Sequence, residues 1–175
     1  MAGTVAAGPS AKISVIRAHH QAAGAKGGAQ RQALGRSRGG FTTKLHARTN
    51  AEGLPLGFVL TGGEAHDVTA YDELMATDET RPQAMLGDKG YDSDDVRADC
   101  YVHGTNPVIP TKSNRKVQRP VDPALYALRN RIERFFNKLK HWRRIATRYD
   151  KTADSFMAFV QLASIKIWLR FVNRT

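Results

Sequence analysis

The stretch from Tyr126 to Lys151 reads YALRNRIERFFNKLKHWRRIATRYDK and says most about the fold of this chain. Just before it, Asp122 and Pro123 form a favourable helix start, because Asp caps free backbone amides and Pro fits the first helical turn. We predict a helix from Pro123 to about Lys140. At about 3.6 residues per turn, its apolar residues fill the single stripe typical of a helix packed on a core. The stripe consists of Leu125, Leu128, Ile132, Phe135, Phe136 and Leu139.

A second face of this helix carries polar residues within an arc of about 60°, counted at about 100° per residue. Its members are Tyr126, Arg129, Glu133 and Lys140. The face borders the apolar stripe, so we expect Glu133 at the rim of the core, where it can meet a second carboxylate on a sheet. The alternative is an ordinary helix-stabilising pair of Glu133 with Arg129 or Asn137.

The rest of the chain alternates between strand-like and helix-like segments. We predict strands at 13–18, 42–49, 54–63, 84–86 and 106–110, and helices at 66–77, 93–103 and 153–172. The second and third strands form a hairpin around the turn NAEG, and the last helix is apolar on nearly every side, which suits a buried helix. This order of elements predicts an α/β domain.

Two acids outside the main helix are candidates for chemistry. Asp88 follows the short apolar strand 84–86, so it is either presented at the carboxyl end of that strand or serves as a turn residue. Asp67 starts the helix 66–77, and we expect it to cap that helix. Its neighbour His66 is the only sign of a metal pair there.

Charge is unevenly distributed over the 175 residues, whose net charge is +11. Residues 1–40 hold six basic residues and no acid, residues 41–110 hold five basic and twelve acidic residues, and residues 111–151 hold thirteen basic and three acidic residues. A positive face beside a cluster of carboxylates suits a protein that binds metal ions on DNA. An ordinary solvated basic face is the alternative. Among polyanionic partners, the net charge favours nucleic acid first and an anionic membrane second.

Other features of the composition narrow the class of protein. Cys100 is the single cysteine, which excludes an intramolecular disulfide and a zinc site built from cysteine pairs. No apolar run reaches the roughly 20 residues that cross a bilayer, so we expect a soluble intracellular protein without a membrane partner. We divide the chain into a basic, Gly/Ala-rich arm at residues 1–40, in which 13–18 can form a first strand, and a main domain at 41–175.

From Arg17 to Val172 the chain resembles bacterial insertion-sequence transposases of the DDE type. It matches the branch whose third catalytic motif is Y(2)R(3)E(6)K, through Tyr126, Arg129, Glu133 and Lys140. The segment LGDKGYDSD, residues 86–94, resembles the second motif and maps the second catalytic Asp of the family onto Asp88.

This resemblance implies a ribonuclease-H-like fold, a mixed sheet flanked by helices. It also implies three carboxylates that hold two Mg²⁺ or Mn²⁺ ions and cut and join phosphodiester bonds of double-stranded DNA at insertion-sequence ends. Asp88 and Glu133 would be two of these catalytic metal ligands, and Tyr126, Arg129 and Lys140 would contact DNA. Further basic residues would contact the DNA backbone: Lys112, Arg115, Lys116, Arg119, Arg143, Arg144 and Arg148.

The first catalytic motif departs from the family. The family places its first Asp five residues before the Arg of Arg-Ala-His, which is the position of Lys12, and the chain holds no acid before Glu52. A protonated lysine cannot ligate a divalent cation. We therefore expect an incomplete catalytic domain that lacks the separate DNA-recognition domain usually preceding it in the family.

Two origins explain this departure. The chain is either the product of a frameshifted element, whose missing segment an upstream-frame polypeptide supplies, or a decayed remnant. We expect impaired transposition by a bacterial cytoplasmic, nucleoid-associated protein that can form a homo-oligomer on DNA. The alternatives are an inactive DNA-binding regulator of an intact transposase and a generic RNA-binding protein.

Overall fold

The computed structural model describes residues 10–78 and 81–173, and within these residues seven strands form one mixed sheet. The strand order is β2-β3-β1-β5-β6, while β4 pairs with β3 and β7 pairs with β1. The strands are β1 (Ser10–Ala18), β2 (Gly35–Ser37), β3 (Gly40–Thr49), β4 (Pro55–Gly62), β5 (Ala84–Leu86), β6 (Asn106–Val108) and β7 (Thr147–Arg148).

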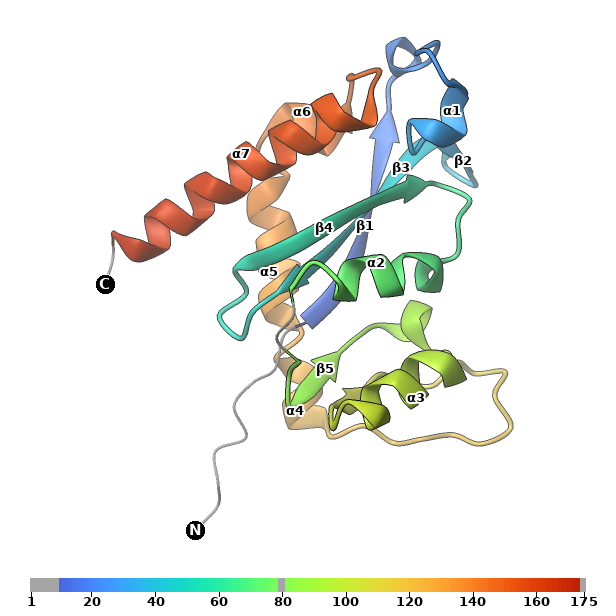
Figure 1. The fold of residues 1–175 in the computed structure, drawn as a ribbon, viewed down its shortest axis with the longest axis vertical. Helices are drawn as coiled ribbons and strands as arrows, with labels where there is room; N and C mark the ends of the chain where they lie inside the picture. Colours follow the sequence, from blue (N-terminus) through green and yellow to red (C-terminus); the bar gives the residue numbers. More distant parts are fainter. Residues whose placement is uncertain (1–9, 79–80, 174–175) are drawn as a thin grey trace.

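Helices lie on both faces of this sheet (Figure 1). The α-helices are α1 (Gly28–Arg31), α2 (Tyr71–Met75), α3 (Asp94–Val102), α4 (Pro123–Ala127), α5 (Asn130–Leu139), α6 (Arg143–Ala146) and α7 (Ala153–Val172). Three 3₁₀ turns complete the elements: η1 (His20–Ala22), η2 (Asp67–Ala70) and η3 (Lys89–Tyr91). A mixed sheet flanked by helices is consistent with a ribonuclease-H-like fold, so the predicted fold class is confirmed.

Strand β1 occupies the middle of the sheet. It runs antiparallel to β3 and parallel to β5 and β7. The strand expected at 13–18 is therefore present and begins three residues earlier, at Ser10. Because β1 and β2 pair with β3, part of the basic arm 1–40 contributes to the sheet, whereas residues 1–9 of that arm lie outside the described residues.

Two large apolar cores lie on opposite faces of the sheet, and a third, smaller cluster joins β5 and β6 to α4. On one face, Ile16 of β1 and Leu45 of β3 pack with buried residues of α5 and α7, such as Phe135 and Phe156. On the other face, Ala11 of β1 packs with residues of α2 and α3. Side chains alternate across a strand, so successive residues of β1 serve different cores. This alternation decides which residues of β1 face α5.

The main helix is divided into two, in contrast to the single helix predicted from Pro123 to Lys140. Helix α4 ends at Ala127 and α5 begins at Asn130. Between them the Arg129 N–H donates to Tyr126 O and the Arg131 N–H to Leu128 O, each at 3.0 Å. These are i to i−3 bonds, which tighten the turn to a 3₁₀ geometry. The predicted cap is present, since Asp122 accepts the Ala124 N–H at 2.8 Å.

Helix α7 has the bounds expected for the last helix but is not buried on all sides. Its buried residues are Phe156, Val160, Ala163, Ser164 and Ile167, whereas Leu162, Ile165 and Leu169 are exposed. By length and apolar composition alone α7 is also able to cross a membrane, which corrects the expectation that no such segment exists. Core helices pass the same test, and one stripe of α7 packs against the sheet.

Candidate active site

Asp88 and Lys12 lie at neighbouring positions because β1 and β5 run side by side. Ser10 pairs with Leu86 in this parallel pair, so Lys12 and Asp88 each follow two residues later. Lys12 shares the α5-facing side of β1 with Ile16, which belongs to the core under α5. Lys12, the position at which the resemblance leads us to expect a first Asp, therefore faces the helix that carries Glu133.

Glu133 is held by two cations. Lys12 Nζ forms an ion pair with Glu133 Oε1, and Arg129 Nη1 lies 2.6 Å from the same oxygen. The hydrogen bond from Lys12, assisted by the charges of Lys12 and Arg129, holds the pKa of Glu133 below its ordinary value. Glu133 is therefore an ionised carboxylate that meets an ammonium group on the sheet instead of the carboxylate expected from the sequence.

Asp88 is the first acid beyond the end of β5. Its Oδ1 accepts the Gly90 N–H at 2.9 Å, so Asp88 caps the 3₁₀ turn η3. Burial raises the pKa of Asp88, the Gly90 N–H opposes this shift, and the nearby Asp67 carboxylate raises it further. The sequence left two positions open for Asp88, the carboxyl end of a strand or a turn. Asp88 combines them, because it follows β5 and caps the turn η3.

Asp67 approaches this region from the other side of the sheet, where α2 packs. The expected helix cap is wrong, because His66 occupies the cap position of η2 without a side-chain cap bond. The Asp67 carboxylate instead lies 2.8 Å from Lys44 Nζ of β3 and packs so tightly against Gly90 that a Cβ atom there would clash. Sequence reasoning missed Lys44, although the period-two alternation of 42–49 placed Lys44 on that face.

The two divalent ions implied by the resemblance do not fit the residues present. Within the described parts of the chain, no group of three His, Cys, Asp or Glu side chains is placed to hold a metal ion. Lys12 and Lys44 already supply positive charge in this region, Lys12 paired with Glu133 and Lys44 with Asp67. An ammonium group has no lone pair to offer a metal, so this arrangement lacks the third ligand.

Tyr126, Arg129 and Glu133 stay in contact with one another although the helix is divided. The Arg129 guanidinium lies 5.1 Å from the centre of the Tyr126 ring, in addition to its contact with Glu133. Lys140 is exposed at the end of α5. The 3₁₀ turn between α4 and α5 thus preserves the face that the residue spacing predicted.

The basic loop 111–120 is accessible to a polyanion. Lys112, Lys116 and Arg119 are exposed, whereas Arg115 is paired with Asp92 at 3.0 Å and with Asp94 at 2.5 Å. The charge of Arg115 is therefore largely compensated within the fold.

The basic residues after α5 differ in how exposed they are and in whether an acid compensates their charge. Arg143 is exposed, and Arg144 pairs with Asp150 at 2.8 Å while lying over the Phe159 ring. Arg148 is completely buried and donates to Thr43 Oγ1 at 2.7 Å, and burial lowers its pKa to about 10. Because the Arg148 guanidinium is used inside the fold, we exclude it from the DNA-contacting set expected from the sequence.

Comparison with known proteins identifies the family. The Transposase DDE domain family matches residues 14–165. A protein of Brucella ovis named as a transposase for insertion sequence element IS6501 is 41% identical over 134 residues, which cover 74% of this chain and 100% of that protein. A protein of Burkholderia cepacia named as a transposase for insertion sequence element IS402 is 32% identical over 142 residues, covering 75% of this chain and 65% of that protein. No solved structure matches this chain. The chain therefore belongs to the Transposase DDE domain family, whose general function is DNA transposition.

Proposed function

We propose that this chain is a transposase catalytic domain that binds double-stranded DNA at insertion-sequence ends and is impaired in cutting and joining it. The observation that carries the proposal is the ion pair between Lys12 and Glu133, at the position where a third carboxylate is needed. DDE transposases generally use divalent metal ions. In a complete site three carboxylates would hold Mg²⁺ or Mn²⁺, and the ions would supply charge stabilisation for the attacking and leaving oxygens of a phosphodiester.

Impairment follows from charge and coordination together. Asp88 and Glu133 remain as the two catalytic candidates, but an ammonium group at Lys12 repels a divalent cation and supplies no lone pair. Glu133 would have to give up two cation contacts before it could turn to a metal ion. The missing ligand and the competing ammonium group thus both weaken the binding of a metal ion.

DNA binding does not depend on this missing ligand. Arg129 contacts both Glu133 and the Tyr126 ring, and we expect Lys140, at the end of α5, to reach the same DNA. A second group of cations supplies backbone contacts: Lys112, Lys116, Arg119 and Arg143, with Arg115 and Arg144 already partly compensated by acids. We expect these contacts to hold a duplex that belongs either to the transposon end or to the target.

The missing third carboxylate also bears on the partners of this chain in the cell. A second copy of the chain, or a polypeptide translated from an upstream frame, is the partner that could bring a further carboxylate to the site. We place the chain in the bacterial cytoplasm, bound to the nucleoid through its basic face. Residues 41–175 would form the main catalytic unit and residues 1–40 the arm that supplies the strand with Lys12.

A second function is favoured by the same ion pair. If Lys12 keeps the site closed to metal, the chain is a DNA-binding regulator that occupies the ends used by an intact transposase. Regulation and impaired catalysis differ in one respect. A regulator inhibits an active enzyme in trans, whereas a merely impaired enzyme is restored by repairing its site.

Strand cleavage and joining on end-bearing DNA in the presence of Mg²⁺ or Mn²⁺ tests these functions. The chains compared are the wild type, Lys12→Asp, and Lys12→Asp combined with Glu133→Gln. We expect silence in the wild type, activity in Lys12→Asp, and silence again in the double variant. Robust joining by the wild type alone refutes the proposed impairment, and silence in all three together with binding to ends favours the regulator.

A further inference from the structure

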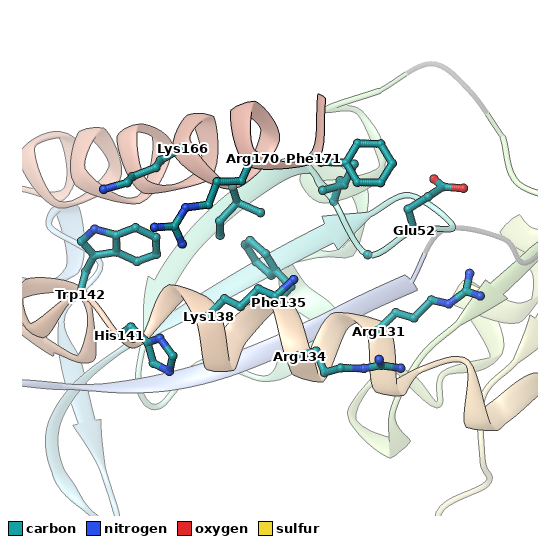
Figure 2. Close-up of a pocket in the computed structure, with 13 residues that line it drawn as sticks. Glu52, Arg131, Arg134, Phe135, Lys138, His141, Trp142, Lys166, Arg170 and Phe171 are labelled. Atoms are coloured by element: carbon teal, nitrogen blue, oxygen red, sulfur yellow. The ribbon is translucent and has the colours of Figure 1, made fainter. Parts of the chain in front are cut away.

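A second basic site lies away from the candidate active site, in a cavity of about 710 Å³ between α5 and α7. Figure 2 shows Lys166 and Arg170 on α7, Arg131, Arg134 and Lys138 along α5, and Trp142 near one end. The turn of the β3–β4 hairpin, residues 52–54, closes the other end. Arg131 donates a hydrogen bond to Ala51 O, which ties this turn to α5 and gives the cavity a fixed wall.

The cavity occupies another face of α5 than Glu133. At about 100° per residue, Arg131, Arg134 and Lys138 point about 100° to 160° away from Glu133 around the helix. Lys140 and Arg129 stay within about 40° of Glu133 by the same reckoning. Helix α5 therefore presents two separate basic faces, and the second one is not explained by the family motif.

The cations of the cavity are not neutralised within the protein. Arg134, Lys138, Lys166 and Arg170 are all exposed, and in the described ranges none of them has a carboxylate within ion-pair distance. Glu52 is the single acid among the residues that line the cavity. Like charges facing each other from two helices repel, and a polyanionic ligand removes that repulsion.

Aromatic rings line the same cavity. Trp142 is half-buried at one end, the Phe171 ring is 40% exposed, and Phe135 lies in the wall. A basic groove with aromatic surfaces is the pattern that binds single-stranded nucleic acid, because unpaired bases can stack on the rings. In a duplex the base faces are already covered by their neighbours, so the rings would find no partner there.

We propose that the α5–α7 cavity binds a short segment of single-stranded DNA, with its phosphates on Arg134, Lys138, Lys166 and Arg170 and a base against Trp142. The proposal takes DNA as the nucleic acid from the proposed function, but the cavity itself is independent of Lys12, Asp88 and Glu133. A strand held here lies on the same helix as the candidate active site, which suits a strand that leaves the duplex near the reacting end.

Binding of a fluorescent oligodeoxythymidylate of about eight nucleotides, without metal, tests this site. The double variant Arg134→Gln/Arg170→Gln removes one cation from each wall. Its matched control is Arg36→Gln/Arg38→Gln, which removes the same charge from two exposed arginines in and beside β2. We expect the first pair to lower the salt dependence, the slope of log affinity against log salt, by about 1.4 and the affinity at 0.1 M salt by about 25-fold. The control should retain the wild-type affinity.

A spectroscopic measurement places the oligonucleotide in the cavity. The chain has two tryptophans, so Trp168→Phe leaves Trp142 as the single emitter. We expect the oligonucleotide to quench Trp142 in this variant, because a stacked base lies against the ring.

The proposal is overturned if both double variants weaken oligonucleotide binding equally, or if the oligonucleotide does not quench Trp142. It is also overturned if a duplex of the same length binds and quenches as strongly as the single strand. A fourth contrary result is that the chain prefers phosphatidylglycerol vesicles to the oligonucleotide and loses this preference in Arg134→Gln/Arg170→Gln. The last would assign the cavity to a lipid surface. The binding assay needs neither cleavage nor metal, so its result does not depend on whether Lys12→Asp joins strands. Conversely, a failure to bind the oligonucleotide does not affect the proposed function.

Discussion

Replacing Lys12 with Asp should exchange an internal ion pair for a metal-dependent site. Lys12 and Glu133 have 19% and 35% of their side chains exposed, so the pair lies between the buried and the solvated extremes. Breaking a fully buried pair costs about 3–5 kcal/mol, while exposed pairs contribute about 0–1 kcal/mol. The variant also places a third carboxylate beside Asp88 and Glu133. We therefore expect Lys12→Asp to lose about 2 kcal/mol of unfolding free energy without metal.

This loss is large enough to measure by thermal unfolding. For a chain of this size 1 kcal/mol corresponds to about 2–4 °C, so Tm should fall by about 4–8 °C. Mn²⁺ or Mg²⁺ at about 100 times its dissociation constant adds about 2.7 kcal/mol to the folded state. The divalent ion should therefore return Tm of Lys12→Asp to about the wild-type value.

Two controls separate coordination from general charge effects. Lys12→Met removes the cation without adding a ligand, so it should lose stability and gain nothing from Mn²⁺. The wild type should be insensitive to Mn²⁺, because its ammonium group occupies the place of the cation. A Tm of Lys12→Asp that does not respond to Mn²⁺, or a wild-type Tm that responds equally, would refute the reasoning.

Three further outcomes follow from the fold. Burial lowers the pKa of His46 from 6.5 to about 4, and because the unfolded chain takes up the proton first, stability should fall by about 3 kcal/mol as the pH drops from 6.5 to 4. Urea unfolding over this range measures the loss, and in His46→Gln this part of the pH dependence should vanish. Asp122→Ala removes the cap of α4 and should cost about 1 kcal/mol in urea unfolding. The exposed Asp95→Ala, in the first turn of α3, removes only a charge near a helix N-terminus and should cost less, about 0.3 kcal/mol. Phe156→Ala empties a fully buried position and should lower unfolding free energy by about 3–5 kcal/mol, while Leu162→Ala, 62% exposed on the same helix, should stay within about 0.5 kcal/mol; similar losses would contradict the packing of α7.

Patterns of residues close together in the sequence predicted much of the architecture. The β3–β4 hairpin follows from two alternating runs around NAEG, and the start of α4 follows from Asp122-Pro123, because turns and caps depend on residues close together in sequence. The spacing of Tyr126, Arg129 and Glu133 likewise predicted one helical face. Their catalytic and DNA-binding roles stay predictions, which the cleavage assay addresses.

Long-range contacts were beyond the reach of these patterns. One local feature was also missed. Over a few residues, 3₁₀ and α turns place side chains with a similar period, so the sequence could not predict that the helix is divided at Arg129. Asp67 met Lys44, instead of capping its own helix, because the sheet brings β3 beneath η2. Lys12 met Glu133 because β1 lies in the middle of the sheet under α5. A residue type and its spacing report the face on which a side chain lies, whereas its partner depends on strand order and helix packing, which join residues far apart in sequence, such as Lys12 and Glu133.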